Sequence, residues 1–251
     1  MVLTLIGISA GIMSSVTGIF ALFGVAMKVW KKYREKKQQP TLFLFLALCS
    51  WAVMCWSASI VYFSAGYSKE LAMLFQRLIY SGTVAGVIFL FLFASEIFFQ
   101  LKKLWKQVYG IIGLIIIALL LLIDSSYPQE LEPGTDYYVI LIKEEFGIAL
   151  LMYLFPTFIG IYITAQRTSQ KVDNPLYRAG YIYIAYGQIF GLLTMGVDTL
   201  GTFVISNLIF YTICLNLTWI LLIFAMWFYY IGWILPPGFR RRIELQEEAK
   251  K

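Results

Sequence analysis

The chain has 251 residues, of which 60% are hydrophobic and 14% charged, with a mean hydropathy of +0.77 and a formal net charge of +6. This composition lies outside the range of water-soluble domains and excludes them as a class. A hydrocarbon core of about 30 Å requires roughly 20 helical residues, and seven apolar stretches of about that length follow one another. We therefore predict an all-α polytopic membrane protein, a bundle of seven transmembrane helices at residues 3–30, 41–65, 72–99, 107–124, 146–166, 179–204 and 206–235.

Lys and Arg gather in alternate connections between these stretches. Seventeen of the twenty follow the first, third, fifth or seventh stretch, and the others are Lys69, Arg77 and Lys143. Because basic residues translocate poorly, this predicts an N-terminus outside and a C-terminus in the cytoplasm, in a multi-pass protein of the cell membrane. The membrane domain is expected to cover residues 1–239, and 240–251 a short charged tail. The positive charge indicates contact with anionic lipid and gives no reason to expect nucleic acid.

Small residues recur at a spacing of four within several stretches. Such rows allow two helix backbones to approach closely in lipid. We expect packing within the bundle, with a homodimer face as the alternative, at Gly7 and Gly11, Gly82 and Gly86, and Gly187 and Gly191. The first stretch lacks a basic n-region and exceeds the usual length of a signal peptide core, so it is predicted to be a retained span. Pro156 is expected to kink the fifth helix.

Two charges lie well within predicted spans, Arg77 near the outer end of the third helix and Asp198 near the outer end of the sixth. Charge inside a bilayer is costly and is usually paired or functional. One interpretation is a structural ion pair or two interfacial groups. The other is a pocket in the outer half of the bundle for a small molecule or a lipid headgroup, with further polar and aromatic groups from Tyr62, Tyr80, Tyr153, Thr194, Asn207 and Tyr211.

The remaining polar residues favour structural roles. Glu96 is expected to contact the basic region around Lys102 and Lys103, while Gln188 and Asn216 are expected to bridge helices by hydrogen bonds. In the connection from 125 to 145, Pro133 and Gly134 mark a turn and Tyr137–Ile142 forms a short strand. This segment could serve as a lid over the bundle or as a passive connector, and the sequence does not decide between these two roles.

The sequence lacks the residues that several kinds of catalytic and cofactor site require. There is no histidine, which excludes Ser-His and Cys-His pairs and sites that need a histidine ligand. The seventh stretch holds no lysine for a retinal Schiff base, and only Asp198 lies deep enough for an intramembrane aspartyl protease. Cys49, Cys55 and Cys214 fall within spans as packing residues. We therefore expect no enzyme, no cofactor and no metal.

Two segments resemble the seven-helix sensor region found N-terminal to many bacterial and archaeal histidine kinases. The first is FLFLALCSWAVMCWSASIVYFSAG followed by ELAMLFQRLIYSGTVAGVIFLFLFASEIF, with Trp51, the Phe75-Gln76-Arg77 segment, Tyr80 and Gly82. The second is YRAGYIYIAYGQIFGLLTMGVDTL, with Arg178, Gly191 and Asp198. The resemblance implies a module that detects a ligand or a membrane state and passes a change in helix geometry to a cytoplasmic partner.

The chain departs from that family after residue 239, where no phosphoacceptor histidine or nucleotide-binding domain follows. A stand-alone receptor with a separate cytoplasmic partner and a fragment of a longer receptor are both open. The pair Pro236 and Pro237 predicts a break in any continuation of the last helix. We favour a sensor that binds a small molecule or lipid; the alternatives are a carrier or channel for a small solute and a lipid-binding scaffold.

Overall fold

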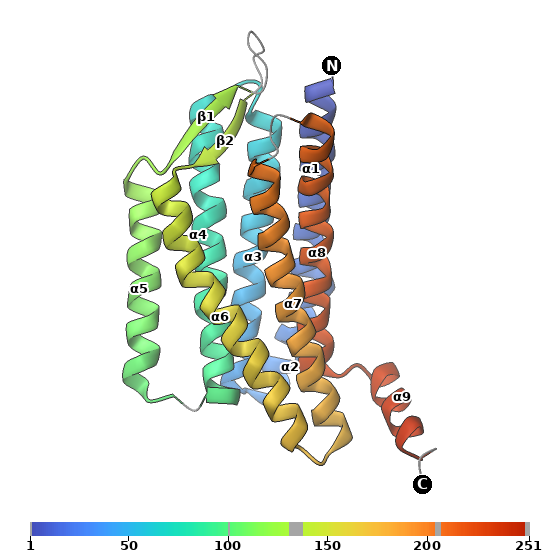
Figure 1. Cartoon of the computed structure of the whole chain (residues 1–251). Helices are drawn as coiled ribbons and strands as arrows, with labels where there is room; N and C mark the ends of the chain where they lie inside the picture. The colour runs from blue at the N-terminus through green and yellow to red at the C-terminus, as the bar shows by residue number, and fades with distance from the viewer. Residues whose placement is uncertain (1, 100, 131–137, 204–206, 249–251) are drawn as a thin grey trace.

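A computed structural model describes residues 2–99, 101–130, 138–203 and 207–248 (Figure 1). Seven helical segments are long and apolar enough to cross a membrane, which confirms the predicted polytopic helical class. The elements are α1 (Val2–Ile19), π-helix η1 (Phe20–Ala26), α2 (Met27–Lys36), α3 (Gln39–Ser64), α4 (Lys69–Ala94), π-helix η2 (Ser95–Phe99), α5 (Lys103–Leu122), β1 (Ser126–Glu130), β2 (Tyr138–Ile142), α6 (Glu144–Lys171), α7 (Pro175–Phe203), α8 (Leu208–Ile234) and α9 (Pro237–Glu248).

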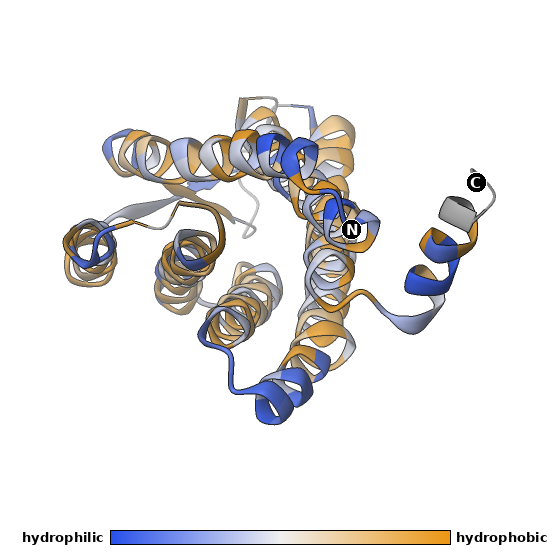
Figure 2. Cartoon of the chain, turned by 90° about the horizontal axis from the view of Figure 1, so that it is seen from below, coloured by the Kyte–Doolittle hydropathy of each residue, from blue (hydrophilic) through white to orange (hydrophobic). Residues whose placement is uncertain are grey.

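The long helices form a ring. α3 packs between α1 and α4, α7 packs between α6 and α8, and contacts of α1 with α8 and of α4 with α6 close the circuit. α5 lies at the margin against α4, as the view along the bundle shows (Figure 2). The hairpin β1–β2 and the start of α1 lie at one end, here called the hairpin end, while α2 and α9 lie at the other, the basic end (Figure 1).

Two parts of the chain differ from the sequence-based expectation. The connection after α5 is an antiparallel hairpin in which Ser126 lies opposite Ile142 and Glu130 opposite Tyr138, so the predicted strand is present as β2 and pairs with a second strand, β1, that was not predicted. Cross-strand pairing provides hydrogen bonds for the backbone of both strands. The predicted turn at Pro133 and Gly134 lies outside the described residues.

The charged tail, for which no secondary structure was predicted, is helical up to Glu248. α8 ends where Leu235 adopts a left-handed conformation with φ 50°, and α9 begins directly after Pro236, which cannot continue the amide hydrogen-bond ladder of α8. The predicted break at the proline pair is thus confirmed. α9 contacts α7 through the rings of Phe239 and Tyr183, whose centroids are 5.9 Å apart.

Glycines bring the helices of the bundle together at several points. A Cβ added at Gly86 would collide with the Trp51 ring of α3, and one added at Gly191 would collide with Phe158 of α6. At another point two backbones meet: a Cβ on Gly180 of α7 would lie 2.7 Å from the carbonyl oxygen of Gly232 on α8, and a Cβ on Gly232 would lie equally close to the carbonyl oxygen of Gly180. The predicted packing role of the small residues within the bundle is therefore confirmed for α4 and α7.

The core is packed most tightly in the half of the bundle near the basic end. Most of the large side chains with less than 2% exposure lie there on α3, α4, α6, α7 and α8, namely Leu44, Leu48, Leu90, Phe93, Ile161, Ile184, Met226, Tyr229 and Ile231, while Leu120 lies near the hairpin end of α5. In the other half of α7, Met195 is only partly buried and Asp198 is exposed. The bundle is therefore closed toward the basic end and looser toward the hairpin end.

The glycine contact between α7 and α8 can be tested with two alanine substitutions on the same helix. Gly180→Ala places a methyl group against a carbonyl that cannot rotate away, so we expect a loss of about 1–3 kcal/mol in unfolding free energy, the usual effect of overpacking. Gly196→Ala meets no atom within 4 Å apart from its chain neighbours and the backbone of its own helix and should gain up to about 1 kcal/mol from helix propensity. Unfolding in mixed micelles measures both; equal effects would contradict the contact.

Candidate functional site

Arg77 does not pair with Asp198. Its Nη2 lies 2.6 Å from Oδ1 of Asp124, and Lys143 Nζ lies 3.7 Å from the other oxygen of the same carboxylate. Asp124 comes two residues after α5 ends, and α5, which packs against α4, brings this carboxylate to the level of Arg77. An ion pair of Arg77 with Asp198, one of the interpretations that the sequence left open, is therefore not formed, because the sequence places both charges at one depth but does not show which helices are neighbours.

Asp198 of α7 instead lies near enough to Tyr80 of α4 for the two groups to interact electrostatically. The Tyr80 hydroxyl also accepts a hydrogen bond of 3.1 Å from Nε2 of Gln76. In the described part of the chain, no basic side chain lies within 4 Å of the Asp198 carboxylate. These three residues form the polar cluster of the hairpin half. Gln76 was not predicted as part of it, although it lies one helical turn from Tyr80.

The Asp198 side chain is exposed, whereas Met195, one turn closer to the middle of α7, is partly buried. The Asp198 carboxylate is therefore accessible in the less buried half of the bundle.

α7 presents one continuous stripe of residues along this interior. Ile184, Gln188, Gly191, Met195 and Asp198 follow a spacing of four and three, which places them on one face of the helix. Along the stripe, burial falls from complete at Ile184 and Gln188 to partial at Met195 and to exposure at Asp198. The interior therefore opens gradually from the middle of the bundle toward the hairpin end.

The other predicted site residues are dispersed. Thr194 lies one turn from Asp198 and donates to the Phe190 carbonyl of its own helix at 2.8 Å. Asn207 begins α8, where its Oδ1 accepts a hydrogen bond from the Phe210 amide. Other packing contacts occupy the three tyrosines, as follows: Tyr153 donates to the Tyr109 carbonyl, Tyr211 packs with Ala10 and Leu215, and Tyr62 lies edge-on to Trp219.

The three remaining polar predictions have different outcomes. Asn216 of α8 donates to Ser9 Oγ of α1 at 3.4 Å, which confirms its bridging role. Glu96 pairs with Lys106 at 2.6 Å, in the expected basic region but with a different lysine. Gln188 bridges nothing: its side chain is completely buried and neither amide atom has a hydrogen-bond partner.

Gln188 has an unpartnered neighbour in the same region. Tyr229 of α8, 1% exposed, packs on Gly187 and stacks with Trp51 at a centroid distance of 5.8 Å, and its hydroxyl also has no partner. A buried polar group without a partner costs about 1–3 kcal/mol. The middle of the bundle therefore holds polar groups that the surrounding side chains do not satisfy.

Comparison with protein-family models, curated proteins and solved structures gives no match for this chain. The resemblance to kinase-linked sensor regions therefore stays a prediction. Within the described residues, no three His, Cys, Asp or Glu side chains gather as metal ligands. The polar cluster around Asp198 is the arrangement that calls for a functional explanation, because it combines an unpaired carboxylate with access from one end.

The observed ion pair can be tested by a double-mutant cycle. Arg77→Gln and Asp124→Asn should show a coupling energy of about 0.5–1 kcal/mol, since Arg77 is 21% and Asp124 64% exposed and solvent weakens the interaction. Arg77→Gln combined with Asp198→Asn should be additive within about 0.5 kcal/mol. Unfolding free energies in mixed micelles provide the measurement. A coupling energy between Arg77 and Asp198, with none between Arg77 and Asp124, would contradict the ion pair seen in the structure.

The unpartnered groups in the middle of the bundle give a second test. We expect Gln188→Met and Tyr229→Phe to leave the unfolding free energy unchanged or to raise it by up to about 1–3 kcal/mol, because each removes a desolvation penalty without leaving a cavity. Tyr153→Phe is the matched control, since its hydroxyl has an acceptor at 3.1 Å, and it should lose about 1 kcal/mol. A loss at Gln188 larger than that of the control would mean that its amide is bonded in the membrane.

Proposed function

We propose that this chain is a receptor-like membrane module that binds a small molecule in the hairpin half of its bundle and relays the event to a partner at the basic end. The observation that carries this proposal is the accessible carboxylate of Asp198, which lies near Tyr80 and has no basic side chain within 4 Å in the described part of the chain. A carboxylate in such surroundings favours a ligand with a positive charge. The ligand class we propose is thus a small organic cation.

The asymmetric packing supports a sensor. Asp198 is accessible from the hairpin end, whereas Gln188, about 15 Å farther along the helix, is completely buried. Beyond that depth lie the large buried side chains of the basic half, including Leu90, Phe93 and Tyr229. An interior that is accessible at one end and ends in a buried core suits recognition of a ligand from one side.

A carrier is the second candidate. Its supporting observation is Gln188, because carriers bind solutes near the bilayer midplane and this amide lies midway along α7 without a partner. An interior open to one side is also one of the two states through which a carrier passes. The two functions therefore differ in whether a bound ligand crosses the membrane.

We also propose that the hairpin end faces outside and the basic end the cytoplasm, since most of the lysines and arginines lie at the basic end. In this orientation α7 connects the two sides. It carries Asp198 at one end and contacts α9 through Tyr183, about 22 Å away. Movement of α7 on ligand binding would thus reach α9, where we place the contact with a cytoplasmic partner.

The binding proposal can be tested by ligand-induced stabilisation. The full chain in phosphatidylcholine nanodiscs is titrated with alkylammonium and quaternary ammonium salts, and with the matched neutral alcohols. We expect one or more cations to raise the unfolding temperature, with a gain of about 2.7 kcal/mol at one hundred times the dissociation constant. Asp198→Asn should abolish this shift and Tyr80→Phe should reduce it.

Asp124→Asn is the control, because it removes a carboxylate of the same end that already has a basic partner. This variant should respond as the unchanged chain does. An equal response in Asp198→Asn, or no response to any cation, would overturn the proposal. If an active cation showed counterflow in proteoliposomes, the sensor proposal would be rejected in favour of the carrier.

A further inference from the structure

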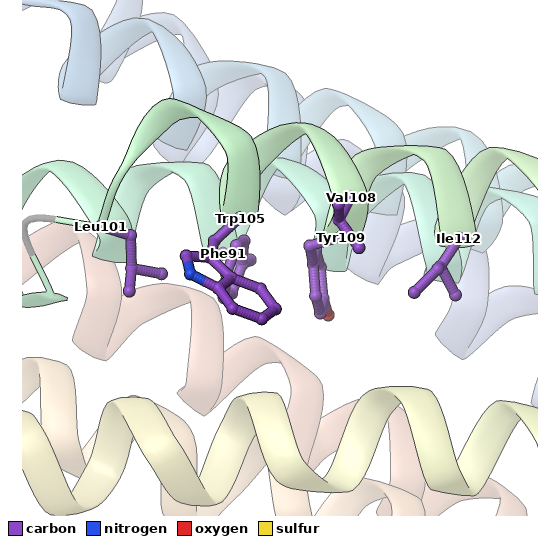
Figure 3. A pocket seen from close by; sticks show the side chains of 6 residues that line it. All are labelled: Phe91, Leu101, Trp105, Val108, Tyr109 and Ile112. Atoms are coloured by element: carbon purple, nitrogen blue, oxygen red, sulfur yellow. The ribbon is translucent and has the colours of Figure 1, made fainter.

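The surface between α4 and α5 contains an apolar groove in the half near the basic end. Its volume is about 330 Å³, and it is lined by Phe91 of α4 and by five residues on and before α5, which are Leu101, Trp105, Val108, Tyr109 and Ile112 (Figure 3). Trp105, Tyr109 and Ile112 follow a spacing of four and three and so share one face of α5. Trp105 is 60% exposed and Ile112 45%, so the groove opens toward the surroundings of the bundle.

Position determines what covers this groove. α5 is one of the seven helices able to span the membrane, and within its apolar window it is the least buried of them. The groove lies along this helix, on a surface that the bilayer surrounds. Its lining suits an apolar chain, because the hydroxyl of Tyr109 is already bonded to Thr157 of α6.

Charge complements the groove at one end. Lys102 and Lys103 directly follow Leu101 and are exposed, and neither lies within 4 Å of a carboxylate in the described part of the chain. The next lysine, Lys106, is neutralised by Glu96. Two uncompensated cations therefore stand where the apolar groove reaches the basic end.

The start of α5 adds to this positive potential. Lys102 caps the helix without a side-chain hydrogen bond, and the first turn holds no acidic residue. Cations are unfavourable at a helix N-terminus, where the macrodipole is positive and amide groups lack partners. A phosphate in this place would interact with both lysines and with the free amides.

We propose that the groove between α4 and α5 binds one anionic phospholipid from the leaflet at the basic end, with its phosphate at Lys102 and Lys103 and an acyl chain along Trp105, Tyr109 and Ile112. The site is separate from the polar cluster around Asp198 and does not depend on the function proposed there. Basic pockets beside membrane helices are suited to such headgroups.

The bound chain has a direct route to the rest of the bundle. Tyr109 stacks between Phe91 and Tyr153, with centroid distances of 3.8 and 4.6 Å, and Thr157 follows Pro156 on α6. An acyl chain against Tyr109 therefore fastens a weakly packed helix to α4 and α6. Lipid composition would thus alter the stability of the packing of α5 against α4 and α6.

The test uses quenching of Trp105 by brominated lipid. The full chain is placed in phosphatidylcholine vesicles that contain a small fraction of phosphatidylglycerol with brominated acyl chains, and the contribution of Trp105 is taken as the difference from Trp105→Phe. We expect half-maximal quenching at a fraction of brominated phosphatidylglycerol about tenfold lower than that of brominated phosphatidylcholine. The double variant Lys102→Gln, Lys103→Gln should lose this preference.

A matched control removes the same charge elsewhere. Arg241→Gln, Arg242→Gln on α9 should keep the preference, whereas its loss there would indicate a general effect of net charge and overturn the site. Equal quenching by both brominated lipids in the unchanged chain would mean contact with any bilayer lipid, and absence of quenching would mean that a second copy or another protein covers the groove. Either result contradicts the proposal.

Discussion

The contact between the backbones of α7 and α8 at Gly180 and Gly232 is the constraint on which the interior of the bundle depends. Lipid provides little hydrophobic drive for one helix to join another, so close packing must hold them. Here the two helices approach until a single methyl group would lie 2.7 Å from a carbonyl oxygen. This contact sets the separation of the helices near the basic end and brings Tyr229 against Gly187.

From this contact toward the hairpin end, the packing of the interior changes. The tight region fills with aromatic and branched side chains, while the stripe on α7 proceeds from Ile184 to the accessible Asp198. A bundle of straight helices held firmly at one end can widen at the other without losing backbone hydrogen bonds, because each helix satisfies its own. The stable half and the accessible half are therefore two consequences of one arrangement.

The sequence predicted the fold class well, because hydropathy and length suffice to identify membrane helices. The break before α9 and the packing role of the glycine rows also followed from local chemistry. The partner of Arg77 did not, since depth along a helix can be read from the chain but the order of helices around the ring cannot. Asp124, at the edge of a span, is equally compatible with a loop and with an ion pair.

Two further features were beyond sequence reasoning for related reasons. In the sequence, Gln188 looks like any amide that bridges helices. Only the packed bundle shows that its side chain has no hydrogen-bond partner. The apolar groove uses Phe91 and Trp105 from different helices, and each looks by itself like an ordinary membrane residue. In both cases the signal lies in the relation between helices.

Gln188 marks the boundary between the two halves of the interior. On the tight side its neighbours on the stripe are apolar, and on the open side the next residues are Gly191 and Met195, which present no fixed hydrogen-bonding group to it. An apolar side chain at this position would pack without the penalty that a buried amide incurs. The amide is therefore better explained by its relation to the open side. It lies about 15 Å from Asp198 along α7 and is the last hydrogen-bonding side chain of the stripe in that direction.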